Sequence, residues 1–344
     1  MTASEWVESD VGWSPATPHQ YQHLTTLSEA AVRFIAEAQA GKRIDLGIAP
    51  LDEQMRGISA GHLALIVGYS HSGKTLVALH AIRHNIERRV LWYTPDEPAV
   101  LVLTKLASAS WGVPAKELEH RVRDGDPWAL KVLGETIEQF PNLLIMDRPL
   151  TPRALNHAYE EACNAWGDEP ELVVVDYLDL LQVGERSGSK AEYVKAFTTE
   201  HVVPTIVLHQ TSRSAGSRGQ RMGIDSGNFG GETVAMFQIG VWRKRNALLH
   251  ELNELRQRTT TTEWSMRREL ELQHDLATHR YTITVNLNKN KRPGGDLIDE
   301  VDLEVQLDTG VLTPLNGGLP SQLRRLRVVG DDPYHRYDTG EVPW

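Results

Sequence analysis

The 344-residue chain is long enough for one large α/β domain with appendages or for two small domains. Hydrophobic residues make up 40% of it, yet no stretch approaches the roughly 18 consecutive apolar residues of a membrane span. A single cysteine, Cys163, excludes an internal disulfide framework and a cysteine-based zinc knuckle. The net charge of −10 argues against a simple basic nucleic-acid coat protein, although a ring could gather its basic residues in a central channel. The start of the chain lacks the basic and apolar regions of a secretory signal, so we expect a cytoplasmic protein with no membrane partner.

Residues 1–43 are predicted to form an arm and a linker helix that precede the main domain. Residues 1–25 show no periodicity, whereas over 28–40 the apolar residues Ala31, Phe34, Ile35 and Ala38 fall on one helical face. This face could pack on the chain's own domain or on a neighbouring subunit, and the sequence leaves both open.

From residue 44 to about residue 315, apolar strands are predicted to alternate with helices. Such alternation is typical of an α/β fold with a mainly parallel sheet that helices cover on both faces. A charged insert at about 244–279 predicts a solvated helical hairpin, and residues 316–344 are expected to form a tail. The predicted helices of the main domain are 74–88, 98–109 and 153–166. The predicted strands are 62–67, 90–93, 142–146, 172–176, 205–209, 234–242, 281–287 and 301–307, of which the last two suggest an antiparallel hairpin at the sheet edge.

A complete GxxxxGK[ST] pattern stands between the first strand and the first helix of this domain. Glycines in such a loop let backbone N–H groups surround phosphate oxygens at a helix N-terminus. We therefore predict an ATP site in which Lys74 reaches the β- and γ-phosphates and Thr75 holds Mg²⁺. The loop consists of Gly68, Tyr69, Ser70, His71, Ser72, Gly73, Lys74 and Thr75.

The second signal is the segment 172–176, in which four apolar residues precede Asp176. An aspartate at the carboxyl end of a central strand lies beside a phosphate loop and can bind Mg²⁺ through water. The pattern is weak alone, but it gains weight because it follows the phosphate loop by roughly 100 residues, as the Walker B motif does. ATP and Mg²⁺ are thus the predicted cofactors.

The residues around Asp176 also carry a resemblance to a known family. Residues 174–181 read VVDYLDLL, similar to the [IV][IV]DYLQL[ML] segment of DnaB-like replicative helicases. Three further landmarks follow the family's order: the lead into the phosphate loop at 44–65, LWYTPDE at 91–97 and PTIVLHQ at 204–210. The resemblance covers about residues 28–315. It implies a RecA-like P-loop ATPase core at 44–315, in a ring, expected to be hexameric, that hydrolyses ATP and translocates on single-stranded DNA.

The same resemblance implies roles for single residues near the nucleotide. Glu97 matches the family's glutamate that polarises the attacking water, with Asp96 as the second candidate. Both acids could instead only cap the helix that follows. Gln210 matches a residue that senses the γ-phosphate and passes its state to the next loop.

Two basic loops are candidate DNA contacts. The segment 212–221 is rich in Gly and Ser and contains Arg213, Arg218 and Arg221, which suits a grip on phosphates without sequence reading. The segment 185–190 supplies Arg186 and Lys190. A solvated surface loop is the alternative in both cases.

The basic run at 288–295 resembles the family segment that enters the ATP site of the neighbouring subunit. Alignment places Lys289 on the family's lysine and Lys291 on its arginine finger. Because a lysine does not replace a bidentate arginine, either Lys291 acts with weaker charge stabilisation or Arg292 reaches in through a shift of one residue.

Some features depart from the family. We expect no counterpart of the primase-binding domain of bacterial DnaB, the stretch between Asp176 and Gln210 is shorter, and the insert at 244–279 is unmatched. A compact motor of this kind is what a phage-encoded relative would look like. Two other functions stay open: a RecA/RadA/KaiC-like ATPase acting in DNA recombination or remodelling without unwinding, and a structure-specific DNA nuclease. Replication or recombination proteins are possible partners in each case.

Overall fold

The computed structural model describes residues 26–39, 41, 43–148, 154–176, 178, 187–211, 221–223, 231–257 and 262–315. The expectations for the arm at 1–25 and for the tail at 316–344 lie outside these ranges. None of the helices within them combines the length and the apolar composition that crossing a bilayer requires.

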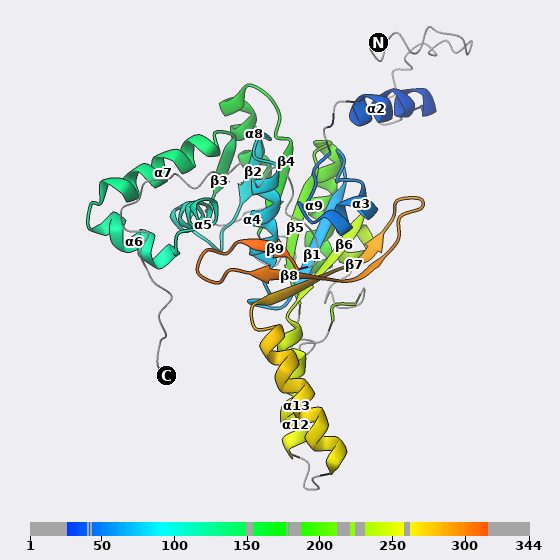
Figure 1. Cartoon of the computed structure of the whole chain (residues 1–344). Helices are drawn as coiled ribbons and strands as arrows, with labels where there is room; N and C mark the ends of the chain where they lie inside the picture. Colours follow the sequence, from blue (N-terminus) through cyan, green and yellow to red (C-terminus); the bar gives the residue numbers. More distant parts are fainter. Residues whose placement is uncertain are drawn as a thin grey trace.

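A nine-stranded sheet organises the described chain (Figure 1). Its order is β3-β2-β4-β5-β1-β6-β7-β8-β9, with parallel pairing from β3 to β6 and antiparallel pairing from β6 to β9. The expected mainly parallel sheet with an antiparallel edge is therefore confirmed. The strands are β1 (Leu63–Gly68), β2 (Val90–Tyr93), β3 (Leu143–Met146), β4 (Leu172–Val175), β5 (Thr205–Gln210), β6 (Phe237–Trp242), β7 (Thr282–Asn290), β8 (Ile298–Val305) and β9 (Leu312–Pro314).

The alternation of side chains along the strands divides the interior into two apolar layers. In β1, Ala64 and Ile66 join one layer, whereas Leu63, Leu65 and Val67 join the other. Such double burial explains why β1, β2, β3 and β4 consist of apolar residues and glycine. Helix α4 (Lys74–His84) covers the first layer, and α8 (Ala154–Trp166) and α9 (Ser187–Glu200) cover the second.

The structure corrects several predicted boundaries. Helix α4 ends at His84 rather than 88, and the strand predicted at 234–242 begins at Phe237 because the short helix α11 (Gly231–Val234) precedes it. The sequence reading missed α3 (Ala49–Met55), α6 (Ala115–Arg123), α7 (Pro127–Gln139) and strand β9. The predicted helix at 98–109 is α5 (Ala99–Trp111), against which α6 and α7 pack through a small apolar cluster of their own.

The insert between β6 and β7 is the predicted helical hairpin, formed by α12 (Lys244–Gln257) and α13 (Glu263–Thr278). Leu252 and Leu255 of α12 pack against Leu272 and Leu276 of α13. The hairpin projects away from the sheet at the bottom of Figure 1. Because β6 runs parallel to β1, its carboxyl end and the root of the hairpin lie at the same sheet edge as the carboxyl end of β1.

Helix α2 (Leu27–Gln39) lies apart from the sheet (Figure 1). Its residue Phe34 is 60% exposed, so the apolar face predicted there is not buried on the chain's own core.

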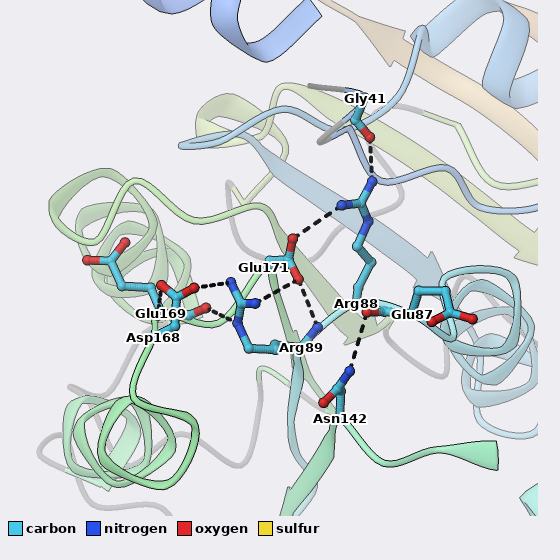
Figure 2. Close-up of polar contacts among 8 residues, drawn as sticks. All are labelled: Gly41, Glu87, Arg88, Arg89, Asn142, Asp168, Glu169 and Glu171. Carbon is cyan, nitrogen blue, oxygen red and sulfur yellow. Dashed lines mark hydrogen bonds and ion pairs between the residues drawn. The ribbon is translucent and has the colours of Figure 1, made fainter. Parts of the chain in front are cut away.

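The residue that follows this region, Gly41, is tied to the core by a polar network shown in Figure 2. Arg88 donates to the Gly41 carbonyl and pairs with Glu171 at 3.2 Å, and Arg89 pairs with Asp168 at 3.0 Å. These contacts join the amino ends of β2 and β4 to the entrance of the domain.

Candidate nucleotide site

The phosphate loop lies where β1 ends and α4 begins. Gly73 is the N-cap of α4 and adopts φ 107°, a conformation that a residue with a side chain rarely adopts. Lys74 Nζ donates to the carbonyl oxygens of Gly68 at 3.0 Å and Tyr69 at 2.7 Å. The lysine is therefore folded over the loop, with its ammonium group where β1 ends.

The loop fits a triphosphate by two further observations. A Cβ on Gly68 would lie 2.5 Å from Ser72 Oγ and 2.5 Å from the Val241 carbonyl oxygen, so only glycine fits at this position. The Ser72 hydroxyl is buried and has no hydrogen-bond partner among the described residues. His71 and Ser70, between them, are exposed. A loop with turned backbone, a cation and an unsatisfied hydroxyl is suited to phosphate oxygens.

Asp176 follows β4 and completes the expected magnesium pair. Its Oδ2 accepts a hydrogen bond from Thr75 Oγ1 at 3.1 Å, although 101 positions separate the two residues. Burial, reinforced by the nearby Glu97 carboxylate, raises the pKa of Asp176 from 3.8 to about 6, while Thr75 and Lys74 act in the opposite sense. Burial makes the charged form of this carboxylate unfavourable, and a cation beside it would stabilise that charged form. Thr75 and Asp176 would therefore hold Mg²⁺ bound with a nucleotide.

Glu97 lies close enough to Asp176 to raise its pKa. It stands in the turn between β2 and α5, and its side chain is 18% exposed. One carboxylate oxygen, Oε1, is paired with Lys105 of α5, and the other, Oε2, is buried and accepts no hydrogen bond from the part of the chain that the structure describes. Asp96 is exposed and has a weaker effect on Asp176. Of the two candidates, Glu97 therefore has the larger effect on Asp176 and the more buried carboxylate.

Gln210 is also brought to this edge. It is the last residue of β5 and stands opposite Gly68 in the parallel pairing of β5 with β1. The next residue, Thr211, donates its N–H to the Gly68 carbonyl at 3.2 Å. Gln210 is therefore adjacent to the phosphate loop, as a sensor would be.

The basic run at the end of β7 lies at the opposite edge of the sheet. Lys289 stands beside Gln238 near the start of β6, and Lys291 N–H donates to the Met236 carbonyl at 3.2 Å. Arg292 points back onto its own chain, where it donates to the Gly57 carbonyl at 2.9 Å and to Ser59 Oγ at 2.8 Å. The two lysines do not join the nucleotide site of their own subunit.

The candidate DNA contacts are only partly described. Arg186, Arg213 and Arg218 lie outside the described residues. Arg221 is paired with Asp299 of β8 at 2.6 Å, and Lys190 lies on α9.

Sequence reasoning missed Lys105 and Lys195. Lys105 is eight positions from Glu97 on the next helix and belongs to no motif. Lys195 Nζ donates to the Gly61 carbonyl at 2.9 Å, far from its own position in the chain. Helical spacing from Glu97 could have suggested the first, whereas only the packing of α9 beside β1 reveals the second.

Comparison with solved structures places the fold among RecA-like ATPase domains. A structure described as an ATPase domain matches with a TM-score of 0.63 and 17% identity, over 85% of this chain and 99% of that one. A DnaB-like replicative helicase, described with its interactions with primase, matches with a TM-score of 0.59 and 17% identity, over 84% and 67%. A KaiC-like protein of Pyrococcus horikoshii OT3 matches with a TM-score of 0.50 and 16% identity, over 79% and 99%.

Sequence comparison gives the family. The replicative DNA helicase DnaB of Leifsonia xyli subsp. xyli (strain CTCB07) is 22% identical over 237 residues, or 61% of this chain. The chain matches 50% of that protein, so it spans about half the relative's length. The model of the DnaB-like helicase C-terminal domain matches residues 44–226, more than half of the chain, and it includes the phosphate loop, Glu97, Asp176 and Gln210. The chain belongs to the family of DnaB-like helicases, by the C-terminal domain that they share.

Proposed function

We propose that this chain is an ATP-hydrolysing motor that works as a hexameric ring on single-stranded DNA and unwinds duplex DNA. The observation that carries the proposal is the convergence of Lys74, Thr75, Asp176 and Glu97 at the carboxyl ends of the parallel strands β1, β4 and β2. Membership of the DnaB-like helicases supports the extension from ATPase to DNA motor.

Each residue has a role that its surroundings suggest. Lys74 releases the loop carbonyls and binds the β- and γ-phosphates, and Thr75 and Asp176 hold Mg²⁺. When bound, Mg²⁺ supplies the positive charge that offsets the charge developing on the phosphates. Glu97 Oε2 accepts the proton of the attacking water, while Lys105 fixes the orientation of the carboxylate through Oε1.

The lysines at the end of β7, Lys289 and Lys291, are proposed to act on the neighbouring subunit. From Ile283, which contacts Gly73 beneath the phosphate loop, to Lys291 the chain extends eight residues, or about 26 Å at about 3.3 Å per residue. This span is much longer than a lysine side chain. We therefore assign Lys289 and Lys291 to the neighbour's triphosphate, with Lys291 in the arginine finger's place and Arg292 as a support of the turn.

DNA contact is proposed for the loop that carries Arg213, Arg218 and Arg221. The ion pair between Arg221 and Asp299 is on the surface, where such pairs contribute little, so Arg221 can exchange the carboxylate for a DNA phosphate. Arg186 and Lys190 are the second candidate contact.

Unwinding of a forked DNA duplex by purified protein with MgATP tests the function, with Lys74→Ala as the control. Unwinding that requires Lys74 is the expected result. Hydrolysis without unwinding or translocation would instead favour an ATPase that remodels DNA. A chain with no Lys74-dependent hydrolysis would contradict the motor itself.

Complementation tests the assignment across subunits. Lys74→Ala and Lys291→Ala proteins should each be nearly inactive, since a finger supplied in trans contributes about 10³–10⁵ in rate in other P-loop enzymes. Mixed rings contain interfaces with one intact phosphate loop and one intact finger, so mixing should restore part of the activity. If mass measurement confirms mixed rings and they stay inactive, the finger acts within its own subunit or has no catalytic role.

A further inference from the structure

Three lysines from two distant segments converge at the sheet edge opposite the phosphate loop. Lys289 and Lys291, at the end of β7, each donate through Nζ to the Thr233 carbonyl at 3.2 Å. Lys195 comes from α9 and donates to the Gly61 carbonyl at 2.9 Å, just before β1 begins. The two acceptor carbonyls belong to neighbouring segments, because the Met236 N–H, three residues after Thr233, donates to the Leu63 carbonyl, two residues after Gly61, at 2.9 Å. Burial, and then the charge of Lys291, lower the pKa of Lys195.

Two of the three lysines have only uncharged partners among the described residues. Within the ranges that the structure describes, neither Lys195 nor Lys291 forms an ion pair, and their hydrogen-bond partners are uncharged carbonyls. His62 does not add to the charge: burial, then Arg292, Lys195 and Arg43, lower its pKa to about 4. Like charges held together at partly buried positions are unfavourable, and an anion that binds among them relieves the repulsion.

We propose that Lys195, Lys289 and Lys291 form one phosphate-binding site, in which Lys195 is a third cation directed at the nucleotide of the neighbouring subunit. A phosphate suits the cluster because its several oxygens accept from several ammonium groups at once. Lys195 also resolves the weakness of a lysine in the arginine finger's place. An arginine finger binds a phosphate through two donors of one guanidinium group. Lys195 and Lys291, which come from different elements, can supply two donors to the same phosphate.

The inference rests on the proposed ring, since only there does a neighbour's triphosphate reach this edge. The same three lysines could bind a phosphate of the DNA backbone, and the two sources of phosphate give different results on mutation. A site for the neighbour's nucleotide affects hydrolysis without DNA, whereas a DNA site affects only DNA binding and stimulation.

The first test is the steady-state ATPase of Lys195→Gln without DNA. Glutamine keeps a donor for the Gly61 carbonyl and removes only the charge. We expect kcat to fall about ten- to a hundred-fold, the effect of one charged hydrogen bond, with little change in KM because the phosphate loop of each subunit is intact. Lys195→Arg should restore most of the rate. The matched control is Lys131→Gln on α7, an exposed lysine that pairs with Glu135 and should leave kcat unchanged.

Two further measurements separate the outcomes. Mixing Lys195→Gln with Lys74→Ala should recover activity, as for Lys291, and inactive mixed rings would overturn the action in trans. Inorganic tripolyphosphate should bind to the Lys74→Ala protein. Its affinity should be at least about ten-fold lower for the double variant Lys74→Ala/Lys195→Gln. An unchanged kcat overturns the inference. So does a loss confined to DNA affinity, because the phosphate would then belong to DNA. If the wild type shows no Lys74-dependent ATPase, the proposed function fails, while tripolyphosphate binding still decides whether the lysines form an anion site.

Discussion

Replacement of Asp176 by asparagine should stabilise the nucleotide-free protein while it removes its function. The folded chain raises the pKa of Asp176 from 3.8 to about 6. A pKa change of about two corresponds to about 3 kcal/mol of free energy. The folded state therefore gains stability from this carboxyl group when it is protonated, below about pH 4. It loses that gain as the pH rises through about 6, so at neutral pH the charged Asp176 is a cost to folding.

Urea unfolding of protein free of nucleotide and Mg²⁺ measures this effect. At pH 7.5 Asp176→Asn should unfold with a free energy up to about 3 kcal/mol above that of the wild type, and the difference should shrink as the pH falls from about 6 toward 4. Asparagine keeps an oxygen that accepts from Thr75, which limits side effects. The matched control is Asp147→Asn, whose exposed carboxylate accepts the Ala99 N–H.

Added MgATP should reverse the order. A ligand at 100 times its Kd stabilises the folded state by about 2.7 kcal/mol, and only the wild type retains the carboxylate that is proposed to hold the metal. A variant that is less stable than the wild type at pH 7.5 without ligand would refute the reasoning, because the buried charge would then contribute to folding. A stability difference that does not depend on pH would refute it as well.

The other predictions concern the catalytic base, the loop and the hairpin. Glu97→Gln should bind MgATP normally in a fluorescence titration and hydrolyse it about 10²–10⁴-fold more slowly, whereas Asp96→Asn should keep most activity; the opposite result would move the base by one residue. Gly73→Ala should abolish nucleotide binding in the same titration, since φ is 107° and the new Cβ would lie 3.2 Å from Ile283; normal affinity would show that the loop adapts. Leu272→Ala should lower the free energy of unfolding of the hairpin by about 2–5 kcal/mol. The amides of α12 and α13 should then exchange hydrogen faster, while ATP binding is kept. Unchanged exchange would mean that Leu272 does not hold the hairpin together.

The sequence was most informative where a segment is buried along its whole length. The central strands could be predicted because burial on both faces selects continuous apolar runs. The missed elements are short or interrupted: β9 has three residues, and α3 has seven with a proline in its first turn. Helix α6 has nine residues and buries only Leu118, so its pattern is weak. Helix α7 is an exception: Asp126 as N-cap, Pro127 in the first turn and the helical spacing of Ala129, Val132 and Leu133 would have allowed its prediction.

The same contrast holds within the site. The phosphate loop and Asp176 could be predicted because each lies in a contiguous segment whose local pattern reflects its chemistry. Lys105 and Lys195 could not, because their importance depends on which carboxylate or carbonyl the fold brings near them. The orientation of Arg292 toward Gly57 and Ser59 likewise follows from tertiary packing and not from the motif.

Strand β7 connects the phosphate loop with the lysines at the opposite edge of the sheet. It begins at Ile283 and its neighbours, directly under Gly73, and ends beside Lys289 and Lys291. Strand β8 pairs with β7 from Thr282 to Leu287 and β6 pairs with it from Thr284 to Asn290, so hydrogen-bonded ladders join the two ends of the strand. A displacement of the phosphate loop that pushes Ile283 would therefore also move the lysines at the far end. In the proposed ring, the same strand would connect each subunit's own nucleotide site with the site on the neighbour that its lysines are proposed to reach.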